Sequence, residues 1–184
     1  SPQQVENLIE IEKQIHYHQS PPDWVLPFTI INRNSPILLS APHGCRTFRN
    51  RNGELWHEED EYTGGMALLL GELCHVSVIA TIWQTNDSDP NDTKEKEEQT
   101  TRSSPYKMAV RRLCQEGVRW VIDLHGASQN SKPMAETQLV DLGTGRDGKA
   151  LSTEQLRILK NSIENNLGVG VTARSGKDGW PASV

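Results

Sequence analysis

Two histidines in this chain each follow an apolar run and each precede a glycine. His43-Gly44 comes after "ILLSA" and Pro42, and His125-Gly126 comes after "WVIDL". Short apolar runs of this kind predict buried strands, and a glycine lets the chain turn sharply where a strand ends. Ligand sites in open α/β sheets gather beyond the carboxyl ends of the strands. We therefore expect the two imidazoles to converge on one point.

A run of four acids lies between the two histidines and offers a third metal ligand. These acids are Glu58, Glu59, Asp60 and Glu61. A helix N-terminus stabilises such a run modestly, whereas a bound cation stabilises it far more. Catalytic zinc sites commonly use three protein ligands and keep one position for water. Asp123 lies two residues before the second histidine and is a candidate to orient a ligating ring.

A reading without a metal also fits each of these features taken singly. A histidine after a strand can simply belong to a turn or to the core. An acidic run before a helix can be a solvated cap. Two strand-end His-Gly pairs together with the acidic run favour the metal site over this alternative.

Composition excludes several classes of protein. The chain has 184 residues, of which 35% are hydrophobic and 23% charged, and its net charge is -5. These values are typical of a globular domain and argue against a general nucleic-acid surface. No apolar run approaches the ~20 residues of a membrane span. The three cysteines show no CxxC spacing, which favours free thiols in a reducing compartment, so we expect a cytoplasmic protein.

Predicted strands alternate with predicted helices along the chain. Apolar and β-branched runs predict strands at 28–32, 37–41, 76–83, 119–126, 137–143 and 169–173. Helical periodicity and capping residues predict helices at 3–18, 63–74, 105–116 and 153–167. This order predicts an α/β fold in a single domain, 1–184, with a mixed, mostly parallel sheet and helices on both faces.

Several details of these elements are also predicted. Thr63 is expected to cap the second helix, with Met66, Leu69, Leu70 and Leu73 facing the core. The polar stretch at 84–103 is too long for an ordinary connection. We expect it to be a mobile loop that lies over the site.

Five short motifs resemble those of the N-formylglutamate amidohydrolase family. In chain order they are Pro42-His43-Gly44, Glu59-Asp60-x-x-Thr63, Asp89-Pro90-Asn91, Asp123-Leu124-His125-Gly126 and Asp141-Leu142-Gly143-Thr144. The resemblance spans about residues 37–144. It implies a phosphorylase/hydrolase-like fold similar to that of zinc carboxypeptidases. It also implies one zinc per chain and hydrolysis of an amide bond by metal-bound water.

The resemblance also implies roles for individual residues. His43 and His125 would be metal ligands, and Asp60 or its neighbour Glu59 would be the third. The substrate would be a small-molecule amide or a short peptide, with no nucleic-acid or membrane partner. Members of the wider group use a glutamate on a late strand as general base. We expect that strand to lie beyond Val184, so the domain is expected to be incomplete at its C-terminus and the base is unassigned.

Three further residues are candidates for binding the substrate. Arg46 can bind an anionic group or stabilise an oxyanion, and its alternative is a solvated loop position. Asp89 and Asn91 follow a predicted strand and can reach its carboxyl end, although they can also serve the turn around Pro90.

Two alternatives to the metallohydrolase remain open. Cys45 lies two residues from His43, so a Cys/His thiol hydrolase is conceivable. Asn91 is followed by Asp92, whereas family members that cleave formylglutamate carry an arginine there. Together with the unassigned general base, this departure keeps a catalytically inactive binding or regulatory module as the alternative function.

Overall fold

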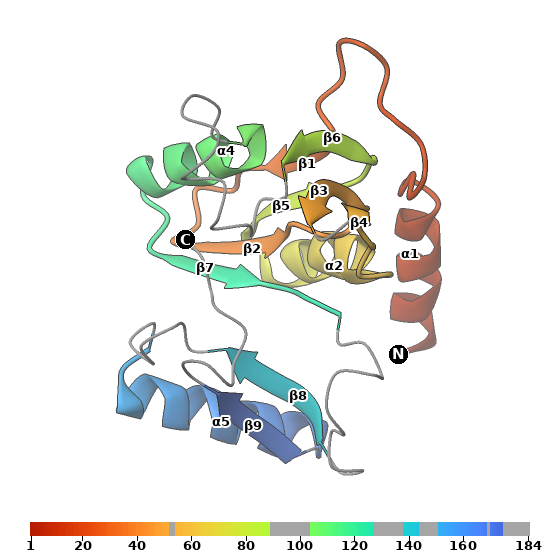
Figure 1. Cartoon of the computed structure of the whole chain (residues 1–184). Coiled ribbons are helices and arrows are strands. Elements are labelled where there is room, and N and C mark those ends of the chain that lie inside the picture. The colour runs from red at the N-terminus through yellow and green to blue at the C-terminus, as the bar shows by residue number, and fades with distance from the viewer. Residues whose placement is uncertain (52–53, 89–103, 127–137, 144–150, 169, 175–184) are drawn as a thin grey trace. The chain divides into compact units, whose positions relative to one another are not determined.

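A computed structural model describes residues 1–51, 54–88, 104–126, 138–143, 151–168 and 170–174 (Figure 1). The chain divides into two compact units, Ser1–Gly126 and Ala127–Val184. Each unit is an α/β arrangement. The candidate site lies in the first.

A four-stranded mixed sheet forms the centre of the first unit. It is built from β1 (Phe28–Ile31), β2 (Ile37–Ala41), β5 (Ser77–Thr81) and β7 (Trp120–Asp123), in the order β1-β5-β2-β7. The β5–β2 and β2–β7 pairings are parallel, and only β1 runs antiparallel to its neighbour. All five residues of β5 are buried, as expected for a strand covered on both faces. The predicted mixed, mostly parallel sheet is confirmed.

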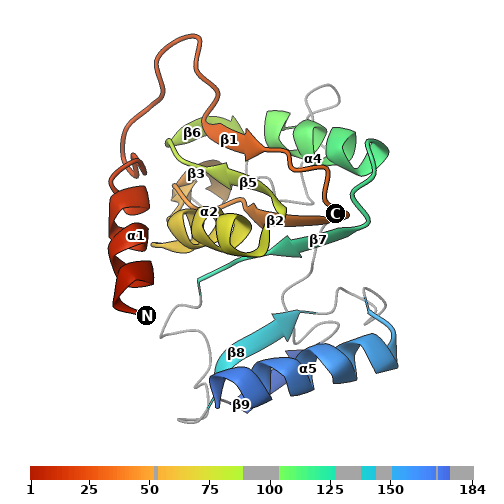
Figure 2. The same ribbon diagram turned by 180° about the vertical axis from the view of Figure 1, so that it is seen from behind.

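Helices cover both faces of this sheet (Figures 1 and 2). On one face, α4 (Pro105–Gln115) packs Tyr106 and Leu113 against Leu38 of β2. On the other face, α2 (Thr63–Cys74) packs Ala67 against Leu39 of the same strand. Successive residues of a strand point to opposite faces, so β2 contributes to both halves of the core. The predicted covering of both faces by helices is also found.

The first helix is shorter than its apolar stripe predicts. α1 (Pro2–Glu12) ends at Glu12, not at residue 18. The backbone beyond it pairs with the region after β5 instead, because His16 N–H donates to the Ile82 carbonyl at 2.8 Å and Gln84 N–H donates to the Gln19 carbonyl at 2.9 Å. These long-range bonds replace the helical ones, and Ile15 is buried outside the helix.

The N-terminus of α2 differs from the prediction by one residue. Thr63 is the first helical residue, and the N-cap is Tyr62 in the left-handed region at φ 68° without a side-chain cap. Thr63 Oγ1 instead donates to the Asp60 carbonyl oxygen at 2.6 Å. Thr63 therefore closes the turn that precedes the helix.

The predicted core face of α2 is mostly wrong. Leu69 is buried, but Met66, Leu70 and Leu73 are 39%, 38% and 51% exposed. The buried face consists largely of small residues, which include Gly71 against Val78 of β5. Small side chains let the helix backbone approach the sheet closely, so the larger residues face outward.

A second, three-stranded sheet was not predicted. It contains β3 (Thr47–Arg51), β4 (Glu54–His57) and β6 (Thr85–Ser88), in the order β4-β3-β6. β6 occupies the start of the stretch at 84–103, so the expected loop is wrong there. Residues 89–103, and with them the predicted lid, lie outside the described residues.

The described residues of the second unit form two strands and one helix. β8 (Gln138–Gly143) pairs in parallel with β9 (Gly170–Arg174), and α5 (Thr153–Leu167) lies between them in the chain. Ser152 and Gln155 form the predicted capping box, and Gly168 ends the helix at φ 65°. All three elements lie where the sequence predicts them.

The composition predicts features of the helices and of the three cysteines. None of the described helices is long and apolar enough to cross a membrane. Cys45, Cys74 and Cys114 are all free thiols, as predicted.

Candidate metal centre

The turn that carries His43 is fixed by a threonine of the neighbouring strand. Thr81 Oγ1, at the end of β5, lies 3.2 Å from the carbonyl oxygens of both Ala41 and Pro42. The same hydroxyl oxygen accepts a hydrogen bond from Cys45 N–H at 3.0 Å. These contacts surround a histidine that is only 4% exposed. The turn that carries His43 is therefore held by the sheet itself.

Gly44 allows this turn to lie directly against its neighbours. A Cβ atom at this position would lie 2.6 Å from the Thr81 carbonyl oxygen and 3.0 Å from the Gly64 Cα atom. Both obstacles are backbone atoms, which cannot move aside easily. The glycine after His43 is thus required by close packing between β5 and the start of α2.

The Asp60 backbone is tied directly to that of His43. Asp60 N–H donates to the His43 carbonyl oxygen at 2.8 Å. Its own carbonyl accepts hydrogen bonds from Thr63, from the backbone N–H at 3.1 Å and from the hydroxyl at 2.6 Å. The loop between β4 and α2 is therefore held to the end of β2 by the residue whose carboxylate enters the site.

His125 follows the strand adjacent to that of His43. β7 pairs in parallel with β2, with Asp123 opposite Ser40. The Leu124 N–H extends this pairing by donating to the Ser40 carbonyl at 2.7 Å. Because both strands end at the same edge, the ring centroids of His43 and His125 lie 5.0 Å apart. The expected convergence of the two imidazoles is confirmed.

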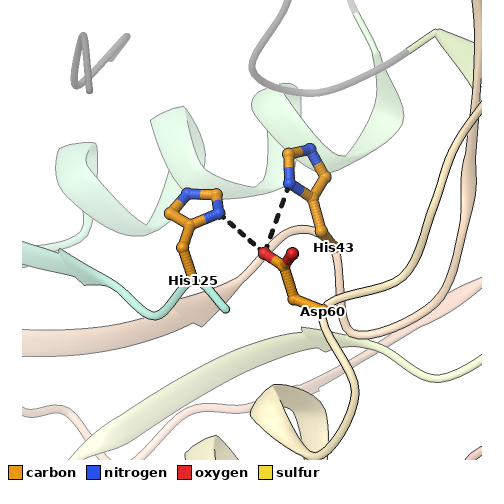
Figure 3. A group of neighbouring side chains, drawn as sticks. All are labelled: His43, Asp60 and His125. Carbon is orange, nitrogen blue, oxygen red and sulfur yellow. Dashed lines mark hydrogen bonds and ion pairs between the residues drawn. The ribbon is translucent and has the colours of Figure 1, made fainter. Parts of the chain in front are cut away.

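His43, Asp60 and His125 form a group that could hold a metal ion (Figure 3). Asp60 Oδ2 lies 3.0 Å from His125 Nδ1 and 3.7 Å from His43 Nδ1. The candidate ligand atoms all lie within 4.8 Å of one another. Tetrahedral zinc with bonds of about 2.0–2.1 Å places its donor atoms about 3.3 Å apart. The two separations from Asp60 bracket that value, so Asp60 and either imidazole are spaced to share such an ion.

Asp60 is held in its charged form. Burial alone raises the pKa of this carboxyl group, but hydrogen bonds with His125 and His43 and with the Gly126 backbone outweigh it, so the pKa lies well below its usual range. A carboxylate must be deprotonated to bind a metal. Asp60 therefore meets this requirement at neutral pH.

The depressed pKa of Asp60 predicts a loss of stability in acid. The ionised carboxylate stabilises the folded protein above the unfolded-state pKa of about 3.9, and this contribution disappears as the pH falls through the lower folded-state pKa. When the pH falls below about 4, the unfolding free energy of the metal-free wild type should decrease. We expect this decrease to be larger than the decrease for the Asp60→Asn variant. Urea titrations at several pH values measure this difference. Parallel pH profiles for the two proteins would contradict it.

The structure distinguishes Asp60 from the other three acids of the run. Glu58 and Glu61 are exposed. Glu59 contacts a different residue, with its Oε1 atom 2.6 Å from His18 Nε2. Asp60, rather than Glu59, belongs to the group of candidate ligands.

His57 is part of the surroundings of the site and was not identified from the sequence. Its ring stacks on that of His43 with centroids 3.9 Å apart and an interplanar angle of 24°. Its Nδ1 atom lies 2.7 Å from the Glu58 carbonyl oxygen, which makes Nδ1 the protonated nitrogen of the neutral ring. Recognition of β4 would have been the only signal, because the strand determines which way His57 points.

The predicted substrate contacts are only partly described. Arg46 Nε donates to Gln84 Oε1 at 2.6 Å, and the guanidinium carbon lies 4.8 Å from the centroid of the Trp56 ring. Asp89 and Asn91 lie outside the described residues. The substrate roles of all three stay predictions, as does the orienting role of Asp123.

The environment of Cys45 argues against a thiol hydrolase. The side chain is fully buried. Burial, followed by the nearby charges of Glu59 and Glu12, raises the pKa of this thiol to about 12. A thiol nucleophile must ionise to attack, and this thiol stays protonated at neutral pH.

Comparison of the chain with models of known families, with curated proteins and with solved structures gives no match. The resemblance to N-formylglutamate amidohydrolases therefore stays a prediction from short motifs. The arrangement of His43, Asp60 and His125 is the structural basis for a functional proposal.

Proposed function

We propose that this protein is a zinc-dependent hydrolase of an amide C–N bond, with one zinc per chain held by His43, Asp60 and His125. The observation that carries the proposal is the convergence of two imidazoles and an ionised carboxylate at the carboxyl edge of the sheet. Imidazole ligands favour zinc or another transition metal over magnesium or calcium. Three protein ligands are also the usual number in catalytic zinc sites.

The chain's own residues would prepare the site for this chemistry. A zinc ion, when bound, would supply Lewis acidity that lowers the pKa of a water molecule and polarises a carbonyl group. Asp60 would contribute the negative charge, and the sheet would fix the two rings. The side chains of His43, Asp60 and His125 are 5%, 13% and 24% exposed. His125 is thus the most accessible ligand and marks the side from which a substrate would enter.

The motif resemblance supports a small-molecule amide or a short peptide as substrate. Arg46 is the proposed contact for an anionic group, with Asp89 and Asn91 as further contacts. The residue that transfers the proton is unassigned. The free thiols of all three cysteines support the proposed cytoplasmic location.

A binding or regulatory module that keeps the fold without turnover is the second candidate. The observation that favours it is Asp92, which follows Asn91 where an arginine would suit a substrate carboxylate. Such a module could retain the metal group, so metal binding alone does not separate the two candidates. Turnover does.

Metal analysis tests the centre itself. We expect about one zinc per wild-type chain purified without chelator, and almost none in the His43→Ala/His125→Ala double variant, because two of three ligands are lost. His75→Asn is the matched control, since His75 is an exposed histidine at φ 54° and asparagine tolerates that conformation. Equal metal in wild type and double variant, or none in either, would refute the proposal.

Hydrolysis assays then separate the two candidates. The zinc-loaded wild type is incubated with N-formyl and N-acetyl amino acids and with dipeptides, and the released amine is measured. Turnover that disappears in the double variant supports the enzyme. Stoichiometric zinc without turnover on any of these substrates favours the binding module.

A further inference from the structure

The segment that follows α1 lies against the loop that carries Asp60. Tyr62 N–H donates to the Tyr17 hydroxyl oxygen at 3.0 Å. His18 Nε2 lies 2.6 Å from Glu59 Oε1. The Asp60 loop is thus contacted once immediately before Asp60 and once two residues after it.

This segment is itself firmly anchored. The His16 ring stacks on Trp83 with centroids 3.6 Å apart and an interplanar angle of 15°. The backbone bonds from His16 to Ile82 and from Gln84 to Gln19 hold both of its ends. Ile15 is only 7% exposed, and its side chain approaches Gly64 in the first turn of α2. Tyr17 and His18 therefore project from a fixed support.

The Tyr17 contact lies at an unfavourable backbone conformation at the start of α2. α2 begins after Tyr62, which adopts φ 68° and provides no side-chain cap. Left-handed backbone in a non-glycine residue is unfavourable and persists when surrounding contacts enforce it. The Tyr17 hydroxyl provides such a contact, and it is held in turn by a hydrogen bond to the Glu12 carboxylate.

We propose that Tyr17 and His18 are positioning residues that hold the Asp60 carboxylate where it can complete the metal centre. This inference rests on the proposed function. His43 and His125 are placed by the sheet, whereas Asp60 lies on a connecting loop. The backbone bond from Asp60 to His43 keeps the loop attached to the end of β2, but a small displacement of its carboxylate would weaken one ligand of three.

Cobalt binding can detect the loss of this one ligand without an activity assay. The metal-free full chain is titrated with Co²⁺, and the visible absorption reports both affinity and coordination. The variants are Tyr17→Phe, which removes only the hydroxyl, His18→Ala, and their combination. His18→Gln is the rescue variant, because an amide nitrogen can replace Nε2 as donor to Glu59. Lys13→Ala is the matched control, since it removes an exposed ion pair with Glu10 on the same segment.

We expect the Tyr17→Phe/His18→Ala variant to bind Co²⁺ about 10-fold or more weakly than wild type, with an altered spectrum. His18→Gln should bind more tightly than His18→Ala, and Lys13→Ala should match wild type. If the double variant does not fold, Tyr17→Phe alone decides, and it should bind at least about 3-fold more weakly than wild type.

Failure of this inference can be told apart from failure of the proposed function. If wild type binds no Co²⁺, the proposed metal centre is wrong and the inference falls with it. If wild type binds Co²⁺ and the double variant matches it in affinity and spectrum, the metal centre stands and the positioning role is refuted. If His18→Gln is as weak as His18→Ala, the hydrogen bond to Glu59 is not the contact that positions Asp60.

Discussion

Asp60→Ala is expected to lower zinc affinity by more than about 100-fold, because residues that merely orient metal ligands already contribute about 10- to 100-fold. One carboxylate oxygen, Asp60 Oδ2, faces both imidazoles, at 3.0 Å from His125 Nδ1 and 3.7 Å from His43 Nδ1. Its removal would leave two imidazole ligands and no carboxylate ligand. Competition with a chromophoric chelator measures this affinity in the purified variant.

The neighbouring acids provide internal controls for this loss. Glu58→Ala and Glu61→Ala remove exposed charges from the same run, so they should bind zinc as wild type does and change stability by no more than about 0.5 kcal/mol. Glu59→Ala should weaken binding less than Asp60→Ala does, through the lost contact with His18. Normal zinc binding by Asp60→Ala would mean that the third ligand lies elsewhere, with Asp89 the next residue to test.

Gly44→Ala is expected to destabilise the fold by about 3 kcal/mol or more. The added methyl group would lie 2.6 Å from the Thr81 carbonyl oxygen and 3.0 Å from the Gly64 Cα atom. Relief of either contact requires movement of backbone at the end of β5 or at the start of α2. Urea titration measures this loss of unfolding free energy. If the variant does not accumulate, the yield of folded protein reports the destabilisation instead.

Gly126→Ala is the matched comparison, because it adds the same methyl group after the other histidine. Here the nearest atom is Asp60 Cβ at 3.2 Å, which belongs to the side chain of a proposed ligand. We expect about 1 kcal/mol or less of destabilisation but a clear loss of zinc affinity. A stability for Gly44→Ala within about 0.5 kcal/mol of wild type would contradict the close packing described for this turn.

The central sheet and its two histidines were predictable from the sequence because they depend on local patterns. Apolar runs indicate the strands that precede His43 and His125. Because the carboxyl ends of parallel strands lie at the same edge of a sheet, the two rings come together there. The residue types alone did not decide which of the four acids joins them. That choice depends on the left-handed backbone of Tyr62 and on the backbone bond from Asp60 to His43.

The errors come from interactions between distant parts of the chain. α1 stops at Glu12 because the residues beyond it pair with the chain after β5. The core face of α2 was wrong because close approach to the sheet favours small residues over leucines. The segments TFRNR and ELWH mix charged and apolar residues, so their periodicity did not reveal β3 and β4, and His57 was missed with them.

The backbone bond between Asp60 and His43 has a consequence for how the protein would respond to its surroundings. It joins a ligand from a connecting loop to a ligand from the sheet, so the loop cannot leave without disturbing the turn after β2. Under the proposed function, zinc binds only the folded arrangement, and free zinc at 100 times its dissociation constant would add about 2.7 kcal/mol to stability. Zinc scarcity would then increase the unfolded population that proteases degrade. The cellular lifetime of the protein would follow the zinc supply.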